Sequence, residues 1–256
     1  MIVAVLQARV SSTRLPGKVL KPIMGEPMIL RQIERIKRVN SIDKLVIATS
    51  KDNTDLPLAE LCERHGINCF RGELDDVLDR FYHVAKLYNA EHIVRLTGDC
   101  PLADPQLIDQ VIAYYLSGDF DYVSNTLEPT YPDGLDVEVF RFSSLEQAWK
   151  EAVLPSQREH VTPFLYHQVG RFKIGSYKNE VDLSGLRWTV DEVADFKLIS
   201  KIYEVLYAIN PHFTTADVMA FLDRNPELKT VNTHHGRNEG YLKSLGEDKL
   251  FLKEKR

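Results

Sequence analysis

The N-terminal stretch decides the fold, and it reads Ile2-Val3-Ala4-Val5-Leu6 followed by Gln7-Ala8-Arg9-Val10-Ser11-Ser12-Thr13-Arg14-Leu15-Pro16-Gly17-Lys18. The first five residues are all apolar, which predicts a buried β-strand. The next twelve contain two arginines, one lysine and three hydroxyl side chains. A strand that ends in a basic, hydroxyl-rich loop indicates a site for an anionic ligand at that end of a sheet.

Strand-type and helix-type segments alternate over the first half of the chain. We expect strands at 2–6, 44–49, 68–71, 92–97 and 122–124, and helices at 29–39, 56–66, 77–88 and 104–116. Strands separated by helices of this length predict parallel βαβ crossovers with helices on both faces of one sheet. In such sheets ligands bind at the carboxyl ends of the strands.

The pattern changes beyond about residue 130. A turn leads into an alternating strand at 133–139, and we expect helices at 144–152, 159–167 and 193–209 and a further strand at 188–190. We interpret 1–230 as one domain, in which about 130–190 binds an acceptor or forms a dimer contact. Residues 231–256 are a polar tail, either an ordered cap or a mobile arm.

Composition excludes several classes of protein. Of the 256 residues, 44% are hydrophobic and 27% charged, which is typical of a globular protein. The net charge of -5 argues against a protein that coats nucleic acid. No segment reaches the apolar length of a membrane helix, the N-terminal run lacks the basic start of a signal peptide, and the three cysteines form no CxxC pair. We therefore expect a cytoplasmic protein without nucleic-acid or membrane partners.

The basic loop at 7–18 has the chemistry of a phosphate-binding site. Guanidinium groups and backbone amides can hold a triphosphate, while Lys18 adds a point charge. The loop is not a P-loop, because Ser12 stands where that motif requires glycine. A solvated basic surface loop is the alternative interpretation.

Two aspartates also follow predicted strands. Asp99 lies in Thr97-Gly98-Asp99-Cys100-Pro101, and Asp191 comes directly after 188–190. Magnesium prefers one or two carboxylates together with substrate phosphate oxygens and water, so both residues could hold Mg²⁺ at the basic loop. Considered singly, Asp99 could instead shape a turn, and Asp191 could cap the following helix.

A further polar group lies in the second half of the chain and could recognise hydroxyl groups of an acceptor. It comprises Asp133, Asp136, Glu138, Glu159 and His160. Isolated polar residues of this kind are also common on protein surfaces.

These motifs resemble a known family. The run Gln7-Ala8-Arg9-x-x-Ser12-x-Arg14-Leu15-Pro16-Gly17-Lys18, the segment Gly98-Asp99-x-Pro101-Leu102 and the segment Val190-Asp191 with Asp195 are similar to motifs of the CMP-sugar-acid synthetases. The nearest likeness is to the spore coat polysaccharide biosynthesis protein F family, because of the runs 75–81, 133–138 and 158–162. The familiar synthetases have proline where this chain has Gln7.

The resemblance implies a Rossmann-like nucleotide-diphospho-sugar transferase fold of the α/β class, with a mixed, mostly parallel sheet and helices on both faces. It implies that Mg²⁺ is held by Asp99 and Asp191, that Arg80 contacts the substrate, and that a homodimer forms. It implies a nucleotide site composed of Gln7, Ala8, Arg9, Ser12, Arg14, Lys18, Thr97 and Gly98.

We therefore expect a cytidylyltransferase that transfers CMP from CTP to a sugar-like acceptor, with Lys18, Arg14, Asp99 and Asp191 as its catalytic residues. Two alternatives stay open from the sequence. One is a metal-dependent glycosyltransferase that consumes a nucleotide sugar. The other is a nucleotide-binding subunit without catalytic activity.

Overall fold

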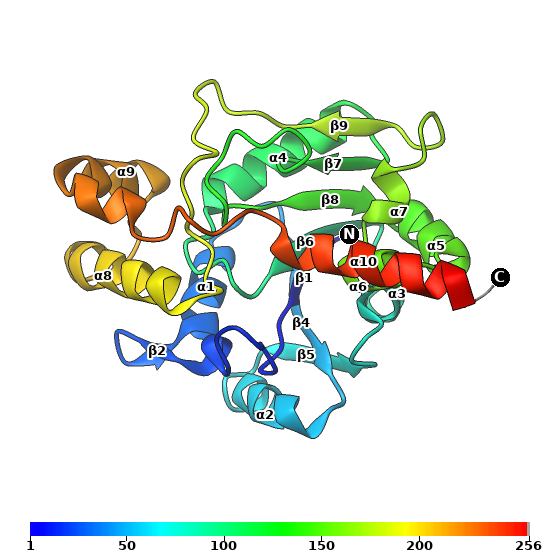
Figure 1. The fold of residues 1–256 in the computed structure, drawn as a ribbon, viewed down its shortest axis with the longest axis horizontal. Helices are drawn as coiled ribbons and strands as arrows, with labels where there is room; N and C mark the ends of the chain where they lie inside the picture. Colours follow the sequence, from blue (N-terminus) through cyan, green and yellow to red (C-terminus); the bar gives the residue numbers. More distant parts are fainter. Residues whose placement is uncertain (255–256) are drawn as a thin grey trace.

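One mixed sheet runs through the computed structural model, which describes residues 1–254 (Figure 1). Within these residues the sheet has seven strands in the order β5-β4-β1-β6-β8-β7-β9. Their bounds are Asn68–Gly72 (β5), Lys44–Ser50 (β4), Ile2–Gln7 (β1), His92–Thr97 (β6), Glu138–Arg141 (β8), Tyr122–Ser124 (β7) and Ile174–Ser176 (β9). Two short strands, Pro22–Ile23 (β2) and Glu26–Pro27 (β3), form a separate hairpin.

Most strand pairings in the large sheet are parallel. Strand β1 pairs in parallel with β4 and with β6, and β4 pairs in parallel with β5. Strand β8 is antiparallel to both of its neighbours, β6 and β7. The predicted mixed, mostly parallel sheet is confirmed.

Helices cover both faces of this sheet, as predicted. The longer helices are Met28–Ile36 (α1), Leu56–Arg64 (α2), Val77–Leu87 (α3), Pro105–Ser117 (α4), Phe142–Glu151 (α5), Val193–Ile209 (α8), Thr215–Arg224 (α9) and Glu239–Glu254 (α10). Two short helices, Pro155–His160 (α6) and Pro163–Tyr166 (α7), follow α5.

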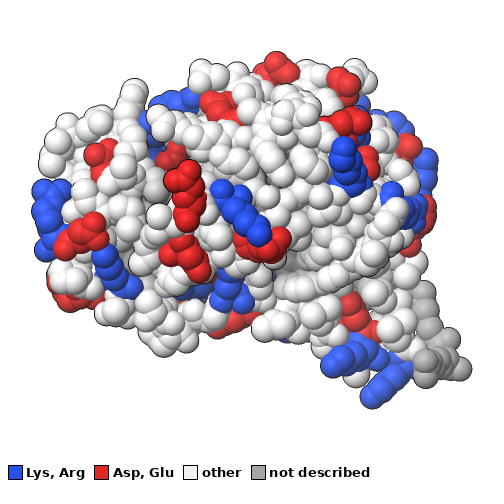
Figure 2. Space-filling model, turned by 90° about the horizontal axis from the view of Figure 1, so that it is seen from above, with Lys and Arg blue, Asp and Glu red and all other residues white. Residues whose placement is uncertain are grey.

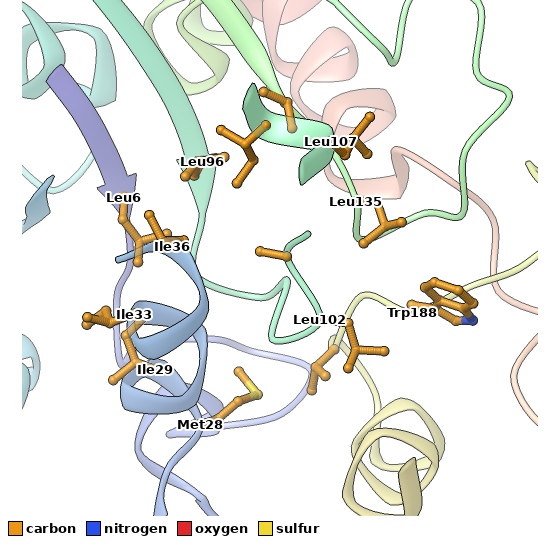
Figure 3. Close-up of a cluster of buried hydrophobic side chains, with 14 of the residues drawn as sticks. Leu6, Met28, Ile29, Ile33, Ile36, Leu96, Leu102, Leu107, Leu135 and Trp188 are labelled. Atoms are coloured by element: carbon orange, nitrogen blue, oxygen red, sulfur yellow. The ribbon is translucent and has the colours of Figure 1, made fainter. Parts of the chain in front are cut away.

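Alternate residues of β1 enter two separate cores. Ala4 and Leu6 pack with α1, α4 and α8, whereas Val3 and Val5 pack with α3, α5 and α7. Figure 3 shows Leu6 facing the apolar side of α1 in the first of these cores. The split follows from the two-residue side-chain period of a strand covered on both faces, and it explains the unbroken apolar run.

The strand predicted at 188–190 is wrong. The Trp188 and Thr189 N–H groups both donate to the Asp133 carbonyl, at 2.6 and 2.8 Å, and the Val190 N–H donates to the Asp99 carbonyl at 2.8 Å. These loop carbonyls satisfy the backbone donors that a sheet would otherwise pair. Gly134 permits the approach, because a Cβ there would lie 2.3 Å from the Thr189 nitrogen.

The helix predicted at 159–167 is broken. Val161 has a left-handed backbone, with φ of 71°, which ends α6 and separates it from α7. The interruption turns Thr162 toward the sheet, where its hydroxyl donates to Glu138 at 2.5 Å. A tertiary hydrogen bond therefore accompanies a conformation that valine rarely adopts.

Strand β9 and helices α9 and α10 were not predicted. Helix α10 packs against α6, where Asp248 accepts from the Ser156 hydroxyl at 2.6 Å and from its N–H at 2.9 Å. Both side chains are buried. The described part of the predicted tail is thus an ordered element, and it lies beside α6 in Figure 1.

Asp55 fixes the basic loop to the sheet. Its buried carboxylate accepts from the Val10 N–H at 2.6 Å and from the Ser50 N–H and hydroxyl at 3.2 and 2.5 Å. Val10 lies inside the loop and Ser50 ends β4. One carboxylate therefore holds the loop at the carboxyl edge of the sheet.

Replacement of this carboxylate should destabilise the protein. We expect Asp55→Ala to lower the free energy of unfolding in urea by about 2–4 kcal/mol, because buried donors at Val10 and Ser50 lose their acceptor. The exposed Asp52 only caps a short helix, so Asp52→Ala should lower the free energy of unfolding clearly less than Asp55→Ala does. Equal losses in the two variants would contradict this role of Asp55.

Candidate active site

A cleft of about 390 Å³ opens at the carboxyl end of β6. Predicted site residues from five separate parts of the chain line it: Arg14, Thr97, Asp99, Asp133, Asp136, Glu138, His160 and Asp191. The structure therefore brings both aspartates and part of the basic loop to one place, where sheets of this type bind ligands.

Lys18 lies directly behind this cleft and joins its two sides. The ammonium group lies 2.8 Å from Asp191 Oδ1 and 3.4 Å from Asp99 Oδ2, and it donates to the Val190 carbonyl at 2.7 Å. Only 10% of the Lys18 side chain is exposed. A buried positive charge thus lies between two carboxylates that are 92 residues apart in the sequence.

These charges support one another. Burial lowers the pKa of Lys18, but the charges of Asp99 and Asp191 outweigh it and leave the pKa above its ordinary value. Burial alone would raise the pKa of Asp99. The Lys18 charge and hydrogen bonds from Thr97 and Cys100 outweigh this effect and bring the pKa below its ordinary value. Lys18 and Asp99 are therefore both ionised at neutral pH.

Close contact between Gly98 and the start of the basic loop positions Asp99. The Gly98 N–H donates to the Gln7 carbonyl at 2.7 Å, and a Cβ at Gly98 would lie 2.7 Å from the Ala8 Cβ. A larger residue at 98 would push the basic loop away from the end of β6. Ala8 and Gly98 thus set the distance between the loop and Asp99.

Arg14 extends the ionic cluster toward solvent. Its Nη2 lies 2.8 Å from Asp191 Oδ2, and its Nη1 donates to Glu239 Oε2 at 3.0 Å. Its Nε lies 3.7 Å from Glu192. The guanidinium therefore faces the cleft surrounded by carboxylates.

A second acidic pair faces Asp99 in the same cleft. Arg237 Nη2 donates to Asp136 at 2.9 Å, and Arg187 Nη1 donates to Asp133 at 2.9 Å. Burial, followed by the charge of Asp136, nevertheless raises the pKa of Asp133 to about 7. Burial also raises the pKa of Asp136. This end of the cleft presents carboxylate oxygens, which suit hydroxyl donors.

Glu138 forms a buried polar group beside the acidic pair. Its carboxylate is in ionic contact with Arg95 and accepts from the Tyr122 and Thr162 hydroxyls at 2.7 and 2.5 Å. Because Glu138 lies in β8, antiparallel to β6, its side chain comes level with Arg95. The Glu138 carboxylate thus has three side-chain partners in the wall of the cleft, whereas the buried Arg95 Nε has no hydrogen-bond partner.

His160 lies in the cleft as a neutral imidazole. Burial, followed by the charge of Arg95, lowers the pKa of His160 to about 4. Its Nε2 lies 3.0 Å from the Ser244 hydroxyl, which donates to Glu159 at 2.6 Å. The His160 ring also packs edge-on against Tyr241.

Several predicted site residues do not line the cleft. They are Gln7, Ala8, Arg9, Ser12, Lys18, Arg80, Gly98 and Glu159. Arg80 is 1% exposed, and its guanidinium donates to the Leu74 carbonyl at 3.4 Å. Arg9 is exposed and lies 3.8 Å from Glu159. The structure therefore does not place Arg80 against the cleft, and the other seven lie behind or beside it.

Sequence reasoning missed much of the cleft wall. Arg95, Tyr122, Thr162, Tyr166, Arg187, Glu239 and Tyr241 line it, and Arg237 contacts its acidic pair. Arg95 was detectable as a lone charge inside an apolar strand. The tail residues gave no periodic signal.

Figure 2 shows acidic and basic side chains interspersed on the face displayed, without a continuous basic area. Among residues 1–254 no helix combines the length and apolar character that a bilayer crossing requires.

Asp99 and Asp191 are the carboxylates of the cleft that could hold a metal ion. Among residues 1–254 no three His, Cys, Asp or Glu side chains are grouped as a protein-only metal site. Magnesium needs only one or two carboxylates when phosphate oxygens and water complete its shell. Asp99 and Asp191 already hold a positive charge between them on Lys18, so the pair fits a cation bound together with a nucleotide.

Comparison with known proteins agrees with this geometry. The family described as Cytidylyltransferase matches residues 3–209. The chain belongs to this family. It is therefore a nucleotidyltransferase and not the glycosyltransferase considered above.

The spore coat polysaccharide biosynthesis protein SpsF of Bacillus subtilis (strain 168) is 32% identical over 244 residues, covering 90% of this chain and 97% of that protein. A cytidylyltransferase structure from Leptospira borgpetersenii serovar Hardjo-bovis (strain JB197) is similar with a TM-score of 0.84 and 32% identity, covering 89% of this chain and 96% of that one.

A structure of CMP:2-keto-3-deoxy-manno-octonic acid synthetase complexed with CTP is similar with a TM-score of 0.63. It is 20% identical and covers 79% of this chain and 98% of that one, so this likeness shows the fold alone. The predicted Rossmann-like nucleotidyltransferase fold is confirmed.

Removal of the Lys18 charge tests the ionic cluster without an activity assay. We expect Lys18→Met to lower the free energy of unfolding by about 3–5 kcal/mol, because two partly buried carboxylates lose their counter-ion. Millimolar Mg²⁺ should then restore more stability to this variant than to the wild type at matched ionic strength.

Lys37 provides the control, since it is exposed and lies at the C-terminal end of α1. Lys37→Met should leave unfolding within about 0.5 kcal/mol of the wild type. A small loss for Lys18→Met, or an equal effect of Mg²⁺ on both proteins, would contradict the described cluster.

Proposed function

We propose that this enzyme transfers CMP from CTP to a sugar acid or a sugar or polyol phosphate and releases pyrophosphate, as a step in surface polysaccharide biosynthesis. The main support is one observation: Lys18 and Arg14 of the basic loop meet Asp99 and Asp191 at one cleft. The names of the similar proteins, a spore coat polysaccharide protein and a synthetase complexed with CTP, point the same way.

In the proposed reaction an acceptor oxygen attacks the α-phosphorus of CTP. A bond forms between that oxygen and phosphorus, the bond to the bridging oxygen of the β-phosphate breaks, and pyrophosphate leaves with the electron pair. The acceptor proton passes to solvent. Little covalent chemistry is required of the protein, so positioning and charge neutralisation carry the catalysis.

The basic loop binds the nucleotide in this proposal. Arg14 and Lys18 neutralise the phosphates, and guanidinium forks suit phosphate oxygens. Gln7, Ala8, Arg9, Ser12, Thr97 and Gly98 complete the nucleotide site along the ends of β1 and β6. Binding would exchange the present carboxylate partners of Arg14 for phosphate oxygens, whereas the buried Lys18 would keep Asp99 and Asp191 and act through its charge.

The acidic half of the cleft binds the acceptor. Asp133, Asp136 and Glu138 offer carboxylate oxygens to hydroxyl groups, and His160 accepts or donates one hydrogen bond as a neutral ring. Glu159 supports His160 through Ser244. Arg80 stays a proposed substrate contact, and it would need a shift of α3 to reach a ligand.

Mg²⁺ is the proposed cofactor, with Asp99 and Asp191 as its protein ligands. When bound it would stabilise negative charge on the phosphates. We also propose that the enzyme acts in the cytoplasm, that it forms a homodimer, and that residues 231–256 are a polar tail of the domain at 1–230, with α10 docked on α6.

A pyrophosphate-release assay tests the function. CTP and other nucleoside triphosphates are each combined with sugar acids, sugar phosphates and polyol phosphates in the presence of Mg²⁺. We expect release with CTP and one acceptor class, and none with Asp99→Ala, which should retain its fold by circular dichroism. Normal turnover in Asp99→Ala would remove this residue from the mechanism.

Substitution of Arg14 measures how much the basic loop contributes to catalysis. Arg14→Ala should cost about 2–4 kcal/mol of transition-state stabilisation, by analogy with other electrostatic stabilisers. Asp109→Ala is the control, because Asp109 binds Asn40 and Ser41 on the surface away from the cleft. A loss below tenfold for Arg14→Ala would contradict its role.

A further inference from the structure

The segment that follows the family region contributes to the active-site cleft. The family match ends at residue 209, yet Gly236, Asn238, Glu239, Gly240 and Tyr241 all line the cleft. These residues lie just before and at the start of α10, and the chain reaches them only after α9. An element outside the shared family region therefore meets the residues expected to bind nucleotide.

Glu239 is the point of contact with the basic loop. Its Oε2 accepts from Arg14 Nη1 at 3.0 Å, while Arg14 Nη2 lies 2.8 Å from Asp191. Both terminal nitrogens of the guanidinium thus face carboxylates. A phosphate group binds arginine through the same terminal N–H groups, so a carboxylate and a phosphate cannot both have the full fork.

The contact is weak enough to be displaced. The Arg14 side chain is 35% exposed and that of Glu239 is 41% exposed, so solvent screens their attraction. The Gly236 N–H, followed by the Arg14 charge, lowers the pKa of Glu239, so the carboxylate is ionised at neutral pH. A triphosphate carries several negative charges and would compete successfully for Arg14.

The tail stays in place without this ion pair. Asp248 binds Ser156 through two buried hydrogen bonds, and Asn232 donates to the Arg187 carbonyl at 3.0 Å and to Asp195 at 2.8 Å. Loss of the Glu239 charge should therefore leave α10 docked. The contact with Arg14 is energetically separate from the anchoring of the helix.

We propose that Glu239 sets the nucleotide affinity of this enzyme by occupying on Arg14 the position of a triphosphate oxygen. The inference rests on the proposed function, since it requires that Arg14 binds the phosphates of CTP. Glu239 then weakens nucleotide binding and is not itself a ligand of the nucleotide. Its removal should tighten binding.

Calorimetric titration with CTP and Mg²⁺, without an acceptor, tests the sign of this effect. We expect Glu239→Gln to lower the Kd for CTP by about two- to fivefold, the range of an exposed ion pair. The amide oxygen of glutamine can still accept from the Gly236 N–H, so the turn before α10 is preserved.

Two controls separate the local contact from general charge effects. Glu247→Gln removes the same charge from the same helix, where Glu247 lies 4.0 Å from Lys243, and it should leave the Kd unchanged. In an Arg14→Gln background, Glu239→Gln should leave the Kd for CTP unchanged, because the arginine for which Glu239 and the triphosphate compete is gone.

The outcomes are distinct. A Kd that is unchanged or higher in Glu239→Gln, or an equal gain in the Arg14→Gln background, overturns the role of Glu239 while leaving CTP binding intact. Failure of the wild type to bind CTP would overturn the proposed function and this inference together.

Discussion

The ammonium group of Lys18 holds the candidate active site together. It contacts Asp191, Asp99 and the Val190 carbonyl, so it joins the loop after β1 to the loop after β6 and to the segment before α8. Three segments distant in sequence are thereby fixed around one buried charge. A buried ion of this kind is stable only when its partners are present, so the three segments must assemble as a unit.

This assembly divides the cleft into two chemically different halves. Cationic side chains from the basic loop lie on one side, and the carboxylates Asp133 and Asp136 lie on the other. Arg187 donates a hydrogen bond to Asp133, and Arg237 donates one to Asp136. In the proposed function the phosphates lie in the cationic half and the acceptor hydroxyls in the acidic half, and the two halves meet at Asp99 and Asp191.

The sequence predicted the parts of the fold whose side chains follow a simple period. The apolar run at 2–6 and the strand–helix alternation defined the sheet, and the end of the strand at 92–97 pointed to Asp99. Asp191 was inferred from a strand at 188–190 that the structure does not contain. Sequence reasoning failed where tertiary contacts replace local preference. Trp188 has strand character, but loop carbonyls take its hydrogen bonds, and Val161 adopts a left-handed conformation that no local pattern announces. Arg237 and Glu239 lie in a polar tail without periodicity, and only the docking of α10 brings them to the cleft.

Asp99 and Asp191 are proposed to form one cation site that serves a nucleotide bound at the basic loop. The most direct measurement is the Kd for CTP, titrated with and without Mg²⁺, in the wild type, Asp99→Asn and Asp191→Asn. We expect Mg²⁺ to tighten CTP binding in the wild type and either substitution to remove this dependence, since each aspartate supplies one of the two protein ligands. Full wild-type Mg²⁺ dependence in either variant would contradict the proposed site.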